Sequence, residues 1–254
     1  MEGDMASLSI AVRVTAASAV LAVLAASDAR RLDATAGQPS PEAIVEKFLH
    51  SDEPPLVSYR ATRVLEASTR GGKMTASVQA LTSRDEAGRL AFEVVSATGS
   101  GLIRNRVLLA ALREEQRLDN DKTGDEAALS PTNYAFAVSP ESEPLVRIDI
   151  KPHSPGPMLL IGSIFVTTDA GDLVRLEGRL SKRPSFWTRS VDITRRYERI
   201  LGVRVPVEMR SRADVRIVGA STFSMTYTYD MINGEPVVSR SARQNDPDTG
   251  LQTE

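Results

Sequence analysis

The chain has 254 residues but no cysteine and only two histidines, His50 and His153. Without cysteine there can be no disulfide, no thiolate nucleophile, no Cys-ligated metal and no lipid on an N-terminal cysteine. The histidines lie far apart and beside no carboxylate cluster, and no Gly-x-Ser-x-Gly turn is present. This argues against a His-based metal site and a Ser-His-Asp hydrolase. We therefore predict no metal, no cofactor and no enzymatic activity, with an unrecognised hydrolase as the least favoured alternative.

A strong excess of either charge is also missing. The 31 basic and 33 acidic residues give a formal net charge of −2, which provides no field for nucleic acid or for an anionic membrane. Basic residues do gather beside two aromatic residues between Arg179 and Trp187. With this overall balance we interpret Phe186 and Trp187 as side chains that plug or rim a curved sheet. We expect no nucleic-acid partner and only transient contact with a membrane.

The N-terminus is apolar, unlike the rest of the chain. From Ile10 to Ala26 the single charged residue is Arg13, and small residues follow that would allow cleavage after Ala29 or as late as Ala36. This pattern is typical of a secretory signal peptide. The alternative is a retained anchor, although a spanning helix needs roughly 20 apolar residues. We expect residues 1–29 to be a signal peptide, residues 30–40 a linker, and the exported protein to be periplasmic and not a lipoprotein.

Alternation of apolar and polar residues dominates the run from Leu159 to Tyr229. Its last segment, for example, reads Phe-Ser-Met-Thr-Tyr-Thr-Tyr from Phe223. Side chains alternate across a strand, so each such segment has one dry and one wet face, and a succession of them indicates an antiparallel sheet that curls around an apolar interior. The predicted strands are 56–68, 73–83, 89–97, 134–138, 145–151, 159–167, 173–180, 190–197, 203–209, 213–218 and 222–229, with a short last strand at 237–238.

Two segments have helical periodicity instead. Residues 41–50 follow a capping serine, Ser40, and place their apolar residues on one stripe. Residues 102–115 repeat apolar residues at helical spacing and end in Arg-Glu-Glu, which we interpret as a solvated end. The sequence therefore predicts a mainly β fold with two helices in one domain at 41–238. Residues 239–254 are polar and are expected to be a disordered tail.

Arg63 is unusual because it falls on the apolar face of its predicted strand. Tyr59, Ala61 and Leu65 share that face. A buried arginine needs a partner, since an unpaired charge in an apolar environment is costly. Either the side chain reaches the solvent at the edge of the barrel, or it is a polar latch inside a cavity that holds a helix or a ligand headgroup. The sequence leaves both alternatives open.

The order of elements resembles the LolA superfamily of exported bacterial proteins. The resemblance lies in the strand Leu56–Arg63 and the stretch Gly-Asp-Leu-Val-Arg-Leu-Glu-Gly-Arg-Leu from Gly171. The segments Pro184–Trp187 and Gly202–Pro206 resemble a related group of exported bacterial proteins. It implies a half-open, curved antiparallel β-barrel lidded by helices, whose apolar concave face receives acyl chains in carrier members. It also implies an inward arginine that helps to hold the lid, and Arg63 matches that position. The chain departs from the lipid-anchored members, which need a cysteine.

Together these patterns predict a periplasmic, non-enzymatic protein that binds lipid acyl chains or a lipidated partner, as in the sorting of outer-membrane lipoproteins. The alternative is a protein-interaction or stress-sensing module of the cell envelope, with an envelope protein as partner and a core filled by its own side chains. The residues expected to form the cavity and its lid are Tyr59, Arg63, Leu65, Phe223, Met225 and Tyr227 from the strands, and Ile44, Phe48, Val107 and Ala111 from the helices.

Overall fold

The computed structural model describes residues 40–238 apart from Asp52, 121–127, 140–143, Trp187 and 217–218. The predicted signal peptide, nearly all of the linker and the predicted tail lie outside the described residues. Those expectations therefore stay predictions.

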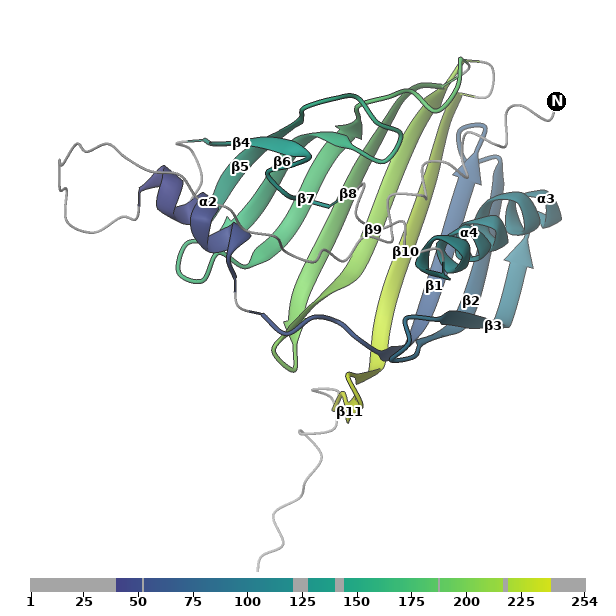
Figure 1. Ribbon diagram of the computed structural model, residues 1–254. Coiled ribbons are helices and arrows are strands. Elements are labelled where there is room, and N and C mark those ends of the chain that lie inside the picture. The colour runs from purple at the N-terminus through teal and green to yellow at the C-terminus, as the bar shows by residue number, and fades with distance from the viewer. Residues whose placement is uncertain are drawn as a thin grey trace, which may run out of the picture.

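The described residues form one antiparallel sheet with helices on its concave side (Figure 1). The helical elements are α2 (Pro41–Leu49), α3 (Gly101–Ile103), the π-helical turn η2 (Arg104–Leu108) and α4 (Leu109–Asn120). The strands are β1 (Tyr59–Thr69), β2 (Met74–Arg84), β3 (Leu90–Gly99), β4 (Tyr134–Val138), β5 (Leu145–Pro152), β6 (Leu160–Thr167), β7 (Leu173–Leu180), β8 (Thr188–Ile200), β9 (Val203–Val215), β10 (Gly219–Ile232) and β11 (Glu235–Pro236).

The strand order is β3-β2-β1-β10-β9-β8-β7-β6-β5-β4, with β11 on the end of β10. Apart from the β1–β10 contact, every neighbour along this path is also a neighbour in sequence. The pairing of β1 with β10 joins the N-terminal three-strand meander to the long C-terminal run. Among the described residues the edge strands β3 and β4 do not pair with each other. The sheet is thus curved and open, which confirms the predicted mainly β, half-open architecture.

Both predicted helices are present and lie near opposite ends of the sheet. In α2 the Ser40 hydroxyl accepts a hydrogen bond from the Ala43 amide at 3.2 Å, as its capping position predicts. This helix packs on β4, and the continuous helix α3–η2–α4 packs on β1, β2 and β3 (Figure 1). The buried stripe of that second helix consists of Ile103, Val107, Leu108, Ala111 and Leu112.

Several strands begin or end up to three residues from the predicted bounds, and the organisation of the strands differs at two places. The predicted strands 203–209 and 213–218 are one continuous strand, β9, in which Ser211 is buried while Arg210 and Arg212 point outward. The alternation therefore continues through a polar stretch that the sequence presents as a break. The last short strand is Glu235–Pro236 and not 237–238, because the turn after Ile232 reverses the chain within two residues.

Candidate functional site: an arginine latch on the concave face

Arg63 lies on the concave face, on the third strand from one edge of the sheet. In β1 the side chains of Tyr59, Ala61, Arg63 and Leu65 are buried and alternate with more exposed ones. The register places Arg63 opposite Tyr227 of β10 on one side and opposite Ala80 of β2 on the other. Its side chain is only 1% exposed, so it does not reach solvent at the edge of the sheet.

The guanidinium group of Arg63 ties the sheet to the second helix. Its Nη1 donates to Oε2 of Glu115 in α4 at 2.6 Å. Its Nη2 donates to the hydroxyl of Tyr59, and its Cζ lies 4.6 Å from the centre of the Tyr227 ring. We call Arg63, Glu115, Tyr59 and Tyr227 the latch. Of the two alternatives that the sequence left open, the structure shows the one in which Arg63 holds a helix.

Arg63 keeps its charge although it is buried. Burial is the largest single effect and acts to lower the pKa of Arg63. The carboxylate of Glu115 and the hydroxyls of Tyr59 and Tyr227 together outweigh it, so the pKa lies well above that of an exposed arginine. The Nε of Arg63 has no hydrogen-bond partner in the described structure. A buried ion pair of this kind contributes little net stability, whereas removing one partner is expensive because the other charge stays buried.

Glu115 is the part of the latch that the sequence interpretation missed. We expected it to be solvated at the end of the helix, but it is 7% exposed. The signal was present in the spacing: Glu115 follows Val107 and Ala111 by eight and four residues, and residues four apart share a helix face. The helix also continues to Asn120, so Glu115 lies within it and not at its end.

A second buried arginine and two more tyrosines adjoin the latch. Arg195 of β8 is 9% exposed and its Nη1 lies 3.5 Å from the hydroxyl of Tyr197. The Tyr229 ring packs edge-on against Tyr59 at 5.8 Å between ring centres, and its hydroxyl donates to the Pro206 carbonyl at 2.9 Å. The interior of the sheet is therefore polar around the latch and apolar beyond it.

We predict that four of the five tyrosines ionise only when the protein unfolds. Burial raises the pKa of Tyr59, Tyr134, Tyr227 and Tyr229 above the ordinary value of about 10. Below about pH 10 this leaves stability unchanged, since neither state loses these protons. Above it only the unfolded chain releases them, so stability falls by up to about 1.4 kcal/mol per pH unit for each such tyrosine.

An alkaline titration followed by phenolate absorbance measures this, with circular dichroism recording unfolding in the same samples. Most of the absorbance change should coincide with unfolding. A gradual rise that is complete while the protein is still folded would contradict the prediction. In Tyr59→Phe, the increase in phenolate absorbance that accompanies unfolding should be smaller by the amount that one tyrosine contributes.

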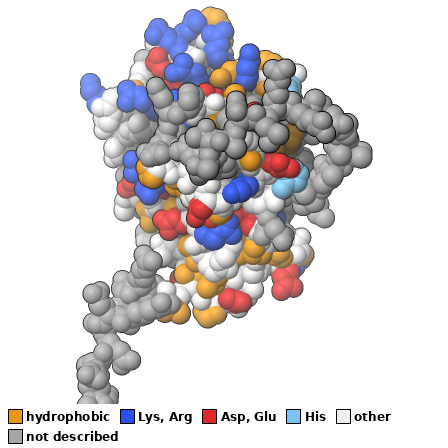
Figure 2. Space-filling model, turned by 90° about the vertical axis from the view of Figure 1, so that its left-hand side faces the viewer, with side chains coloured by type: hydrophobic (Ala, Val, Ile, Leu, Met, Phe, Trp, Pro, Cys, Tyr) orange, Lys and Arg blue, Asp and Glu red, His pale blue; other side chains and the backbone are white. Residues whose placement is uncertain are grey.

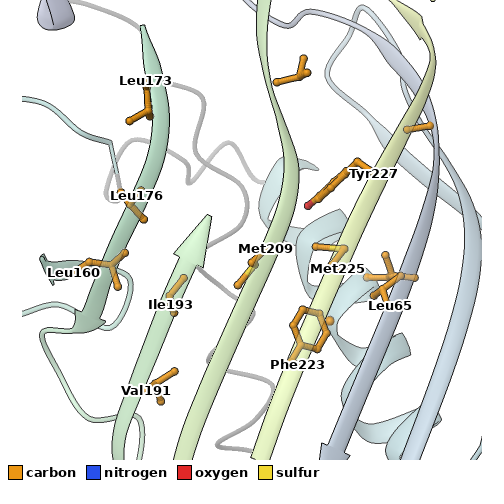
Figure 3. Close-up of a cluster of buried hydrophobic side chains, with 14 of the residues drawn as sticks. Leu65, Leu160, Leu173, Leu176, Val191, Ile193, Met209, Phe223, Met225 and Tyr227 are labelled. Atoms are coloured by element: carbon orange, nitrogen blue, oxygen red, sulfur yellow. The ribbon is translucent and has the colours of Figure 1, made fainter. Parts of the chain in front are cut away.

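The predicted site residues fall into two groups. Figure 3 shows Leu65, Phe223, Met225 and Tyr227 side by side on neighbouring strands β1 and β10, and all four are buried. Val107 and Ala111 of the second helix are buried as well, and with Tyr59 and Arg63 they belong to this group. Ile44 and Phe48 do not: they lie on α2 at the other end of the sheet, where Phe48 packs against Phe136 of β4 at 6.2 Å between ring centres.

Between the two helices, the central strands present an apolar concave face. Register pairs align one row of inward side chains across them, and this row runs Leu176, Arg195, Met209, Met225 and Leu65. Val191, Ile193 and Phe223 flank this row, as Figure 3 shows. All of these side chains are buried. All of them except Arg195 belong to one core cluster that also includes side chains of both helices.

The outer face carries a depression of a different kind. A depression of about 400 Å³ there is lined largely by charged side chains of β7, β8 and β9. These charges pair with one another: Arg175 lies 2.9 Å from Glu177, and Glu208 accepts from Arg210 at 2.7 Å. Within the described ranges no three His, Cys, Asp or Glu side chains are grouped as metal ligands. No helix in the same ranges is long and apolar enough to cross a membrane.

Comparison with known proteins finds similarity to solved structures and not to any family model or curated sequence. Among solved structures, the chain is similar to a DUF1329 family protein from Desulfovibrio piger, with 15% identity, a TM-score of 0.37, and coverage of 74% of this chain and 90% of that one. It is also similar to a LolA superfamily protein from Nitrosomonas europaea, with 10% identity, a TM-score of 0.32, and coverage of 75% and 92%.

Proposed function

We propose that this protein is a periplasmic, non-enzymatic binding protein that takes up a lipid acyl chain, or the acyl group of a lipidated protein, between its concave face and the second helix. The observation that carries the proposal is the latch: a buried ion pair fastens the apolar face of the second helix to the apolar face of the sheet. An ion pair in that place adds little stability over an apolar contact, but it defines one closed arrangement of the helix.

Opening that helix would expose matching apolar surfaces on both sides. The helix contributes Val107, Leu108 and Ala111, and the sheet contributes Leu65 and Met225. Burying about ten methylenes of an acyl chain would contribute roughly 8 kcal/mol, which offsets the loss of the helix contacts that the chain replaces. The apolar N-terminal sequence, which predicts export, fits a protein that meets lipids in the cell envelope.

A second candidate is a protein-interaction module with a filled core. It is supported by the burial of the concave side chains, which pack with side chains of both helices in one cluster. A permanently filled core has this arrangement. The two candidates differ in whether the helix opens.

Native mass spectrometry followed by organic extraction separates them. A carrier should retain lipid from its host, detected as added mass and as extracted acyl chains, and should bind a fluorescent fatty-acid probe. A protein that has no added mass and fails to bind the probe would support the filled-core module and contradict the carrier.

Arg63→Leu is expected to change probe binding more than Arg60→Leu does. Arg60 lies three residues away on the exposed face of β1, so it is a matched control. Loss of the ion pair favours the open helix, and if the open form is the one that binds, apparent affinity should rise by about tenfold. Fluorescence titration of both variants measures this. Equal effects would show that the latch does not control access.

A further inference from the structure

Three turns meet at one end of the sheet, at the top of Figure 1. They are the β1–β2 turn Arg70–Lys73, the β7–β8 connection, described from Ser181 to Phe186, and the β9–β10 connection, which begins at Arg216. Thr188 pairs with Val215, which places the second turn next to the third. The hydroxyls of Thr69 and Ser221 lie 2.9 Å apart, which places the first turn next to the third.

These turns carry basic residues and no acidic one. Arg70, Lys73, Lys182, Arg183 and Arg216 are all exposed, and we call these five residues the basic end. Figure 2 shows Lys and Arg side chains gathered at the same end of the molecule.

Acidic residues on the adjoining strands do not neutralise the basic end. Asp192 and Asp214 are paired with strand arginines, Arg179 at 2.8 Å and Arg189 at 3.8 Å.

The opposite end of the sheet has the reverse composition. The turns 85–89 and 168–172 together contain four acidic residues and one basic residue. Two of these carboxylates are paired, Asp85 with Arg89 at 2.7 Å and Asp172 with Arg199. The net charge of −2 therefore conceals a concentration of basic residues at one end of the sheet. From the net charge we expected no electrostatic attraction to an anionic membrane. That argument assumes that the charges are spread evenly over the surface, and here they are not.

An exposed aromatic side chain lies within the basic end. Phe186 is 71% exposed, and the Arg216 guanidinium lies 4.5 Å from the centre of its ring. Phe186 therefore lies at the rim of the sheet and does not plug it, so the first of the two roles expected from the sequence is wrong for this residue. Trp187 lies outside the described residues. Aromatic side chains interleaved with Lys and Arg are typical of surfaces that enter the headgroup region of an anionic membrane.

We propose that the basic end, together with Phe186, docks on a bilayer surface that contains anionic phospholipids. The charges stand at the tips of three adjacent turns, which can touch a flat surface at the same time. Proteins that bind single-stranded nucleic acid instead line a groove with cations and stacking platforms. The proposal rests on the charge distribution and the exposed ring and does not depend on acyl-chain binding.

Co-sedimentation with vesicles tests the proposal on the full-length protein. Binding of each protein to phosphatidylcholine vesicles is compared with its binding to vesicles that also contain phosphatidylglycerol. The apolar N-terminal segment contributes equally to both measurements, so the difference between them reports the effect of the anionic lipid. Anionic lipid should increase binding, and salt should reverse the increase. Each basic residue near an anionic surface increases the binding constant about fivefold. The double variant Lys182→Glu/Arg183→Glu should therefore bind the anionic vesicles at least about 30-fold more weakly.

The matched control, Arg60→Glu/Arg89→Glu, changes the net charge equally at exposed positions away from the basic end. It should retain most of the binding, and Phe186→Ser should lose the part that resists salt. Circular dichroism establishes that each variant is folded. The proposal is overturned if phosphatidylglycerol adds no binding, if both double variants lose binding equally, or if the basic end binds a labelled oligonucleotide and not the vesicles.

Discussion

Glu115→Leu is expected to destabilise the protein by about 3–5 kcal/mol, because it leaves the Arg63 guanidinium charged and buried without its carboxylate. Glu115 supplies the one carboxylate that the structure shows in contact with Arg63. Denaturation with urea, followed by circular dichroism, measures the free energy of unfolding.

Two further variants show whether the cause is the unpaired charge. Glu114→Leu removes the neighbouring carboxylate, whose partner Arg117 is 54% exposed, and should cost no more than about 1 kcal/mol. Arg63→Leu/Glu115→Leu removes both charges and should recover about 2 kcal/mol or more relative to Glu115→Leu alone, since apolar replacements of a buried pair are often neutral. If the double variant is as unstable as the sum of the two single variants, the explanation fails.

The latch shows which parts of the site could be predicted from the sequence and which could not. Arg63 is conspicuous because period-2 alternation places it among apolar side chains, and that inference needs only local geometry. Its partner lies 52 residues away on another element, and local patterns carry no distance information of that kind. The pairing of β1 with β10 is likewise non-local, so the sequence could predict the strands but not which of them would flank Arg63.

The distribution of charge over the surface could not be predicted from the composition either. The five residues of the basic end come from three separate turns, and only the sheet topology brings these turns together. Net charge sums over the whole surface and so cannot distinguish an even distribution from a segregated one. The Arg-Leu-Ser-Lys-Arg-Pro-Ser-Phe-Trp segment carried the local signal, but its exposure depends on the turn that it forms.

Gly162→Ala is expected to destabilise the protein by about 3 kcal/mol because two strands lie too close for a side chain at this point. Gly162 of β6 pairs with Gly178 of β7. A Cβ on Gly162 would lie 2.0 Å from the Glu177 carbonyl oxygen and 2.4 Å from the Gly178 Cα. Both are backbone atoms, so the strands themselves would have to separate, and the curvature that forms the concave face would change with them.

A graded series of three alanine variants tests this steric explanation by urea denaturation. Gly178→Ala should cost less than Gly162→Ala, since its nearest contact, the Ile161 carbonyl oxygen, would be at 2.9 Å. Gly101→Ala is the control: its Cβ would meet only the end of Arg104 at 3.6 Å, and alanine in the first turn of a helix should stabilise by up to about 1 kcal/mol. A Gly162→Ala protein as stable as the original would mean that the two strands can separate without cost, and this would contradict the steric explanation.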